Sequence, residues 1–115
     1  IESKRITKKN GKHFHVIGTH DHYDYAGLGN GVNFLRYSSW HWFLMTGNSL
    51  SYHNRLRMSD YQRIFRNIGF KIEFEDKDLH KKDLEKLESL PLNIIFEGYS
   101  KEDLATSIYY VDLAR

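Results

Sequence analysis

Two polar segments carry the side chains of this sequence that could take part in chemistry. The first is residues 20–24, HDHYD, which directly follow the apolar run at 13–19. The second is residues 52–57, YHNRLR, which precede an amphipathic stretch. Histidine changes protonation near neutral pH, and a guanidinium can bind a carboxylate or a phosphate through two hydrogen bonds. Acid–base chemistry and anion binding are therefore the functions that these segments suggest.

The first segment has two interpretations. His20 and His22, with Asp24 two residues later, resemble the metal-ligand signature of metallo-β-lactamase-type hydrolases, in which imidazoles bind zinc and an aspartate contacts a second ion. Tyr25 stands where that signature has its final histidine, and the chain is too short for that family's fold. The second interpretation is a substrate-facing loop at the carboxyl end of a strand, where α/β proteins bind their ligands.

The second segment also has two interpretations. Arg55 and Arg57 point to the same side if the backbone there is extended, so together they can bind an anionic group. Alternatively, they pair with nearby carboxylates and hold the loop in place. The carboxylates within reach of this second interpretation are Asp21, Asp24 and Asp60.

Composition limits the class of protein. The chain has 115 residues, of which 40% are hydrophobic, so we expect one small domain spanning 1–115 with a core of its own. It has no cysteine, which excludes thiolate chemistry and fits a cytoplasmic location. No apolar run approaches the roughly 20 residues that span a bilayer, and the net charge is only +2. That charge argues neither for nor against a nucleic acid. We expect neither a membrane nor a nucleic acid as partner.

The clearest structural signal is a helix followed by a strand. Ser59 and Gln62 have the spacing of a capping box at the start of a helix over 60–68, and Gly69 fits the left-handed position that ends one. The period then changes to two, which predicts a half-buried strand over 70–75. Its apolar face comprises Phe70, Ile72 and Phe74.

Other signals complete an α/β order of elements. We predict a strand over 13–19, a helix over 78–90, a single helical turn after Ser100, and a strand over 107–114 that is buried on both faces. Ser38 or Ser39 caps a short helix that ends at Gly47. The apolar side chains of this short helix are expected in the core or in a lid packed on it: Trp40, Phe43 and Leu44.

Taken in order, these blocks resemble the C-terminal part of a class I S-adenosylmethionine-dependent methyltransferase. The resemblance covers most of the chain from residue 10 onward, and it depends on the combination of blocks. These are Asn10-Gly11 with His15-Val16-Ile17, His20-Asp21-His22-Tyr23, residues 33–38 (NFLRYS) with Trp40 and Trp42, residues 52–57 with Ser59-Asp60-Tyr61, and Gly69-Phe70.

The resemblance implies a Rossmann-like methyltransferase sheet that is mostly parallel, with the last strand antiparallel. This chain would supply about three of its strands with flanking helices, and the last two, 70–76 and 107–114, would form an antiparallel pair. The family's glycine-rich cofactor loop and its acidic partner have no counterpart in residues 1–115, and Gly18 stands where an acidic residue is common. We therefore expect a C-terminal fragment that is inactive alone and associates with itself or with a missing N-terminal half.

The resemblance also implies the chemistry: S-adenosylmethionine as cofactor and a small-molecule or sugar-like methyl acceptor as substrate. Loops 19–25 and 52–57 would face one another across the acceptor. The implied catalytic residues are His20 and His22, and the implied substrate-binding residues are Asp21, Tyr23, Tyr52, His53, Asn54, Arg55 and Arg57. The alternatives are a metal-dependent hydrolase that uses His20, His22 and Asp24, and a binding module without catalysis.

Overall fold

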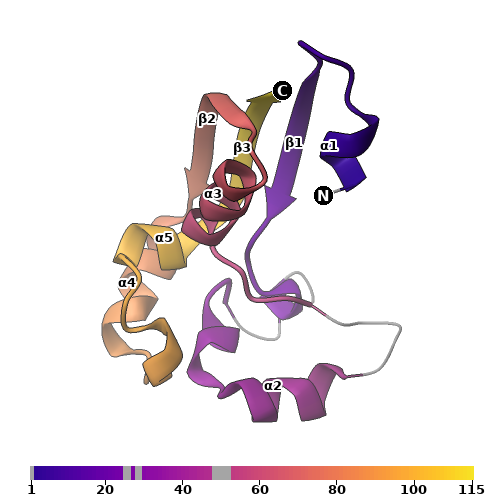
Figure 1. Cartoon of the computed structure of the whole chain (residues 1–115). Helices are drawn as coiled ribbons and strands as arrows, with labels where there is room; N and C mark the ends of the chain where they lie inside the picture. Colours follow the sequence, from indigo (N-terminus) through magenta and orange to yellow (C-terminus); the bar gives the residue numbers. More distant parts are fainter. Residues whose placement is uncertain (1, 25–26, 28–29, 48–52) are drawn as a thin grey trace.

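A computed structural model describes residues 2–24, 27, 30–47 and 53–115. Its centre is a three-stranded sheet of β1 (Lys12–Gly18), β2 (Lys71–Leu79) and β3 (Thr106–Ala114), shown in Figure 1. The spatial order is β1-β3-β2, and β3 is antiparallel to both of its neighbours. The prediction that the three strands share one sheet, with the last two antiparallel, is confirmed.

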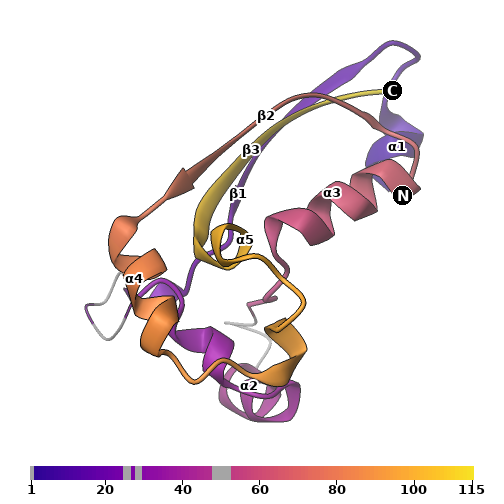
Figure 2. The ribbon, with the colours of Figure 1, turned by 90° about the vertical axis from the view of Figure 1, so that its left-hand side faces the viewer.

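The helices divide into two groups. α3 and α1 lie on one face of the sheet, whereas α2, α4 and α5 gather beyond one end of the strands (Figure 2). None of the helices among the described residues is long and apolar enough to cross a membrane. The helices are α1 (Glu2–Ile6), α2 (Ser39–Thr46), α3 (Met58–Asn67), α4 (Lys81–Ser89) and α5 (Lys101–Ala105), with 3-10 turns η1 (His22–Asp24), η2 (Asn33–Arg36) and η3 (Ile94–Phe96).

The start of α3 differs from the prediction. Arg57 occupies the N-cap position, and its amide donates to Asp60 Oδ2 at 3.0 Å, so Ser59 is inside the helix. The Ser59 amide donates instead to Asp103 Oδ1 at 3.2 Å, because α5 brings that carboxylate to the first turn of α3. The end of the helix is as predicted, since Gly69 has a φ of +82°.

A β-bulge changes the faces of β2. Ile72 pairs with Leu113, but Phe74 pairs with Asp112, the very next residue of β3. The extra residue reverses the alternation of side chains, so Phe74 points to the opposite face and is 53% exposed. The prediction of one continuous apolar face is therefore wrong beyond Ile72.

Two separate cores stabilise the molecule. The sheet core is formed by Phe70, Tyr109, Val111 and Leu113, packed against α3. Ile108 and Tyr110 are only half-buried, so the prediction that β3 is buried on both faces is wrong. The loop core lies beyond the end of the sheet and comprises Val32, Phe34, Leu35, Trp42, Leu90, Phe96 and Leu104.

The two remaining apolar surfaces are exposed. Figure 2 shows α3 against one face of the sheet. On the opposite face, Phe14 is 62% exposed and Val16 is 57% exposed. The short helix α2 begins at its predicted cap, since Ser38 Oγ accepts a hydrogen bond from the His41 amide. Its side chains are not all in the core: Trp42 is buried, but Trp40, Phe43 and Leu44 are exposed.

Candidate functional site

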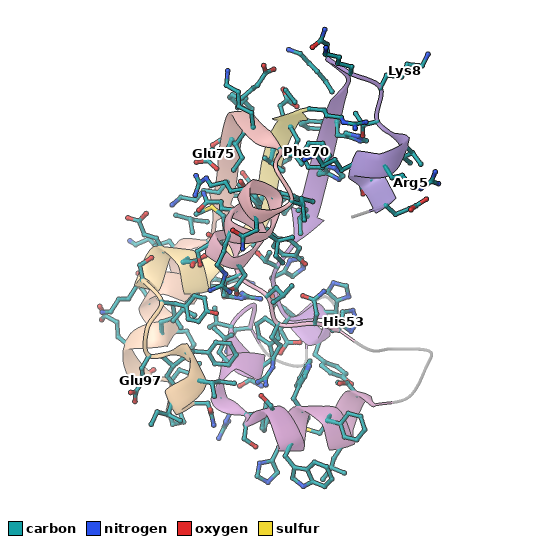
Figure 3. The ribbon with its side chains drawn as sticks, in the orientation of Figure 1. Arg5, Lys8, His53, Phe70, Glu75 and Glu97 are labelled. Atoms are coloured by element: carbon teal, nitrogen blue, oxygen red, sulfur yellow. The ribbon has the colours of Figure 1, made fainter. Side chains whose placement is uncertain are left out.

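The polar segment after β1 lines a cavity of about 160 Å³. The strand ends at Gly18, and the chain turns through η1, so the cavity lies just beyond the carboxyl end of β1. His53 reaches it from the segment before α3, and Figure 3 shows His53 between the end of β1 and α2. The lining residues are His20, Asp21, His22, Tyr23, Phe34, Trp42 and His53.

A short series of hydrogen bonds shapes the loop that carries these residues. The Asp21 amide donates to Gly31 O at 2.9 Å, and the Gly31 amide donates to Asp83 Oδ1 at 3.1 Å. A Cβ atom on Gly31 would lie 2.6 Å from Asp83 Oδ2, so any side chain there would displace this carboxylate. Asp83, on α4 and only 1% exposed, thus anchors the loop through Gly31.

Asp21 stabilises the turn itself. Its carboxylate accepts a hydrogen bond from the Tyr23 amide at 3.0 Å, and the residue is 4% exposed. Burial raises the pKa of this carboxyl, and the bond from the Tyr23 amide opposes that effect. These contacts give Asp21 a structural role in the wall of the cavity.

His20 is held against the sheet. Its Nδ1 lies 3.0 Å from Ser107 O, and a carbonyl oxygen only accepts, so Nδ1 is the donor. The amide of Thr19 donates to the same carbonyl at 2.9 Å. The first residues of β3 therefore determine where the histidine segment begins.

His22 and His53 are in direct contact across the cavity wall. Their ring centroids are 3.9 Å apart, and the His20 ring lies 5.6 Å from that of His22. Burial lowers the pKa of His22, and the neighbouring His53 and His20 lower it further. His22 is therefore neutral at pH 7 and can accept a proton.

Aromatic residues from the loop core complete the wall. Phe34 and Trp42 meet edge to face, with ring centroids 5.7 Å apart. Trp42 Nε1 donates to His53 O at 2.8 Å, which ties α2 to the second polar segment. The expected approach of loops 19–25 and 52–57 is thus present among the described residues, with α2 packed beside them.

Arg55 lies beside a neighbouring groove. Its Nη1 donates to Phe34 O at 3.1 Å and to Tyr37 O at 2.5 Å. Its guanidinium carbon is 5.4 Å from the Trp42 ring and 5.0 Å from the Phe96 ring. With Asn54, Arg55 lines a groove of about 420 Å³ that shares Trp42 with the cavity.

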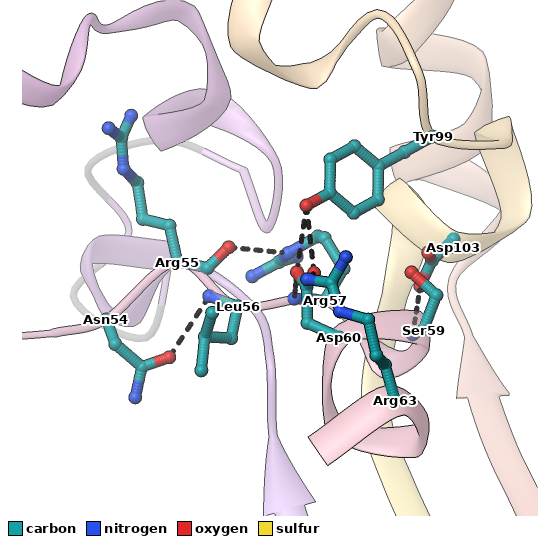
Figure 4. Close-up of polar contacts among 9 residues, drawn as sticks. All are labelled: Asn54, Arg55, Leu56, Arg57, Ser59, Asp60, Arg63, Tyr99 and Asp103. Atoms are coloured by element: carbon teal, nitrogen blue, oxygen red, sulfur yellow. Dashed lines mark hydrogen bonds and ion pairs between the residues drawn. The ribbon is translucent and has the colours of Figure 1, made fainter. Parts of the chain in front are cut away.

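Arg57 is fully buried and lies apart from both hollows. Its Nε donates to Arg55 O at 3.1 Å, and its guanidinium carbon is 4.9 Å from the Phe34 ring. Burial lowers the pKa of Arg57 to about 10, so it is still a cation at pH 7. Figure 4 shows the Arg55 side chain pointing away from Arg57. These hydrogen bonds of Arg55 and Arg57 hold the loop in place through backbone carbonyl oxygens, where the second interpretation expected carboxylates.

The donors proposed for a metal do not converge. Asp24 is bound to Lys82, with Nζ 2.9 Å from Oδ2. Within the described ranges, no group of three or more His, Asp or Glu side chains has a metal-binding arrangement. His20, His22 and Asp24 therefore do not fit the hydrolase signature. Tyr52, a predicted substrate-binding residue, lies outside the described residues, as does Tyr25.

Sequence reasoning missed three residues of this site. Phe34 and Trp42 line the cavity, and the only available signal was the aromatic density of residues 33–45. Asp83 had a clearer signal, because it falls on the leucine face of the helix predicted over 78–90, where a carboxylate needs a partner.

Comparison of the chain with protein-family models, with curated proteins and with solved structures found no match.

Proposed function

We propose that this chain forms the acceptor-binding side of a class I S-adenosylmethionine-dependent methyltransferase whose acceptor is a small or sugar-like molecule. The observation that carries the proposal is the cavity at the carboxyl end of β1, where the polar segment 20–23 meets His53. Ligands of α/β proteins bind at this end of the strands. The aromatic walls and a neutral histidine suit a compact acceptor that loses a proton.

The sheet supports the same proposal. β1 and β2 run in the same direction, and the last strand lies between them in the opposite direction. The resemblance implies this pattern for the C-terminal strands of a methyltransferase sheet. The direction of the strands is independent of the residues that line the cavity, so the two observations support the proposal separately.

The residues of this chain act on the acceptor in the proposed mechanism. Phe34 and Trp42 pack against it and exclude water, which aligns its hydroxyl or amine for in-line attack. His22 accepts the proton of that group. His20, held by Ser107 O, keeps the neighbouring ring in position. S-adenosylmethionine, when bound, would supply the electrophilic methyl group, whose bond to sulfur would break with the electron pair left on sulfur.

No described residue is assigned to the cofactor, because none belongs to a glycine-rich loop that leads from a strand into a helix. We propose that a separate cofactor-binding half covers the sheet face opposite α3. The exposed side chains Phe14, Val16 and Phe74 support this, because monomeric proteins rarely leave such a group of apolar side chains uncovered. Self-association through the same face is the alternative arrangement.

The test is methyl transfer by the chain joined to its cofactor-binding half, with labelled S-adenosylmethionine and a panel of small hydroxyl and amine acceptors. His22→Gln should lower kcat about 100-fold or more, as expected for loss of a general base, and should change KM little. His41→Gln is the matched control, because His41 is exposed on α2 and does not line the cavity. Wild-type turnover in His22→Gln would contradict the assignment.

The pH profile gives a second test of the same residue. The pKa of His22 lies below its ordinary value of 6.5, so kcat/KM should fall as the pH drops through the pKa of this group. The same decrease in His22→Gln would show that another group is responsible.

A further inference from the structure

Strand β1 forms an open edge of the sheet. The order β1-β3-β2 leaves the outer side of β1 without a neighbouring strand among the described residues. Helix α1 lies on the same face of the sheet as α3, so it does not continue the sheet beyond β1 (Figure 2). Backbone groups on the outer side of an edge strand are free to pair with a strand from another chain.

The register with β3 shows which residues of β1 turn their backbone groups outward. The Thr19 amide donates to Ser107 O at 2.9 Å, and the Arg115 amide donates to Gly11 O at 3.1 Å. The register between these two pairs has no shift, so hydrogen-bonded pairs recur at every second residue of β1. The alternate residues of the strand therefore direct their N–H and C=O groups away from β3. We call them the outward residues of β1: Lys12, Phe14, Val16 and Gly18.

The two edges of the sheet differ in charge. β2 has charged side chains at six of its nine positions and a bulge between Ile72 and Phe74, and both features discourage pairing with a further strand. β1 has one charged side chain when its histidines are neutral, that of Lys12, whose Nζ is already 2.6 Å from Glu73 Oε2. Charge therefore protects the β2 edge and leaves the β1 edge available.

We infer that β1 pairs antiparallel with β1 of a second copy of this chain, so that the two sheets join into one. A two-fold axis at His15 would place Phe14 opposite Val16 of the second copy, and Lys12 opposite Gly18 of the second copy. This register pairs all four outward residues of each copy, and each pair exchanges two hydrogen bonds. A shift of the axis to Phe14 or to Val16 would leave an outward residue unpaired.

The side chains suit the same register. Phe14 is 62% exposed and Val16 is 57% exposed, both on the face opposite α3. An aromatic side chain directly across from a β-branched one is a favourable cross-strand pair, and like charges directly opposite are unfavourable. Lys12 would lie across from a glycine, so no two cations of β1 meet. The strand is therefore complementary to itself, which favours a second copy over an unrelated partner.

The inference does not rest on the proposed function, because it concerns the edge of β1 and the cavity lies beyond the end of that strand. The proposed cofactor-binding half covers the sheet face, which is a different surface. Pairing along the edge also differs from self-association through that face, because it uses backbone groups. A backbone measurement can therefore distinguish the two arrangements.

The first experiment follows amide hydrogen exchange of the full chain by NMR over a range of concentrations, with sedimentation to measure the fraction of dimer. The amides of Phe14 and Val16 should exchange roughly tenfold or more slowly in the dimer than in the monomer, because the second copy pairs with them. The amides of His13 and His15 are internal controls, since they donate to β3 in both states and should change little.

Charged variants test the register. A chain with Phe14→Lys and Val16→Lys would place lysines opposite lysines across the seam, and its dimer should dissociate roughly tenfold or more readily. A chain with Phe14→Glu and Val16→Glu should behave alike, whereas an equimolar mixture of the two should dimerise again, because each lysine then meets a glutamate. Phe74→Lys is the matched control, since Phe74 is 53% exposed but lies on β2, and it should leave dimerisation unchanged.

Four results would overturn the inference. The chain could remain monomeric up to about 1 mM. A dimer in which the Phe14 and Val16 amides exchange as fast as in the monomer would assign association to another surface. Undiminished dimerisation of both charged variants, shown to be folded by far-UV circular dichroism, would exclude the register. Slow exchange of both amides in a monomer of the chain joined to its cofactor-binding half would assign the edge to that half.

Discussion

The sheet core and the loop core are built in different ways. The sheet core packs one long helix on one face of a sheet, and its backbone groups are paired within these regular elements. The loop core is made of short pieces, and side chains satisfy its backbone: Arg55 binds two carbonyl oxygens and Asp83 binds the Gly31 amide. The cavity is bordered by the loop core because irregular backbone can bring side chains from several segments to one point.

Arg57 joins the two cores. Its guanidinium carbon lies 4.9 Å from the Phe34 ring in the loop core, while its backbone begins α3 and its amide binds Asp60. Tyr99 donates to the same carboxylate at 2.9 Å. A cation buried between the cores, with carboxylates nearby, makes the two halves depend on each other.

Loss of this junction should have the largest effect. Arg57→Ala removes the buried cation and its bonds and leaves the carboxylates of Asp60 and Asp103 without it. We expect the free energy of unfolding to fall by about 3–5 kcal/mol in urea titration. Arg63→Ala is the control, since its side chain is 70% exposed and its ion pair with Asp60 should contribute no more than about 1 kcal/mol. Equal losses in both variants would disprove the junction role.

A leucine-to-alanine substitution in each core should show that the two cores are distinct. Leu113 is 1% exposed in the sheet core and Leu35 is 0% exposed in the loop core, so each leucine-to-alanine change should cost about 2–5 kcal/mol. Only Leu35→Ala should disturb the cavity, because Leu35 packs among its aromatic walls. The measurement is thermal unfolding together with NMR shifts of the His22 and His53 rings. Shifts of the same size in Leu113→Ala would mean that the cores are not distinct.

Loss of the hydrogen bond between Gly31 and Asp83, which anchors the loop, should have an intermediate effect on stability. In Gly31→Ala the new Cβ would lie 2.6 Å from Asp83 Oδ2, so the buried hydrogen bond must break or shift, at a cost of about 1–3 kcal/mol. The Asp21 amide should then exchange its hydrogen faster. Gly98→Ala is the matched control, because nothing lies within 4 Å of a Cβ atom at that position. Slow exchange at Asp21 in Gly31→Ala would show that the anchor does not hold the loop.

The smallest expected effect is the dependence of stability on pH. It involves one histidine beside the sheet core and one in the cavity wall. Burial is the main cause that lowers the pKa of His15 beside the sheet core and of His22 in the cavity wall, each from 6.5. Below about pH 6.5 the unfolded chain therefore binds more protons than the folded chain does. The free energy of unfolding should decrease as the pH falls below this value, and the contribution of the two histidines should be fully present above it.

NMR titration of the two rings gives the pKa values directly. His15→Gln and His22→Gln should each weaken the dependence of unfolding on pH, whereas His41→Gln, on the exposed surface of α2, should not. If the free energy of unfolding depends on pH as steeply in His15→Gln and in His22→Gln as in the wild type, other groups cause the loss of stability in acid.

Sequence reasoning succeeded where local signals were sufficient. The helix that ends at Gly69, the cap at Ser38, the cap at Ser100 and the strands β1 and β3 all follow from residue types within one or two turns of the chain. It failed at Phe74, because a bulge depends on the partner strand and has no signature in the alternation itself. It also failed at Ser59, whose amide is bound by Asp103 from a distant helix.

The sequence by itself determined the three strands, the order of α2 to α5, and the two polar segments that carry the candidate chemistry, because helix and strand periods and turn residues act over short distances. It did not predict α1, and the first two residues of the helix predicted over 78–90 belong to β2. Tertiary structure alone decided that His22 meets His53, that Arg57 is buried while Arg55 lines a groove, and that Asp83 reaches Gly31. Those contacts join residues far apart in the chain, and their energies depend on burial that appears only once the segments pack together.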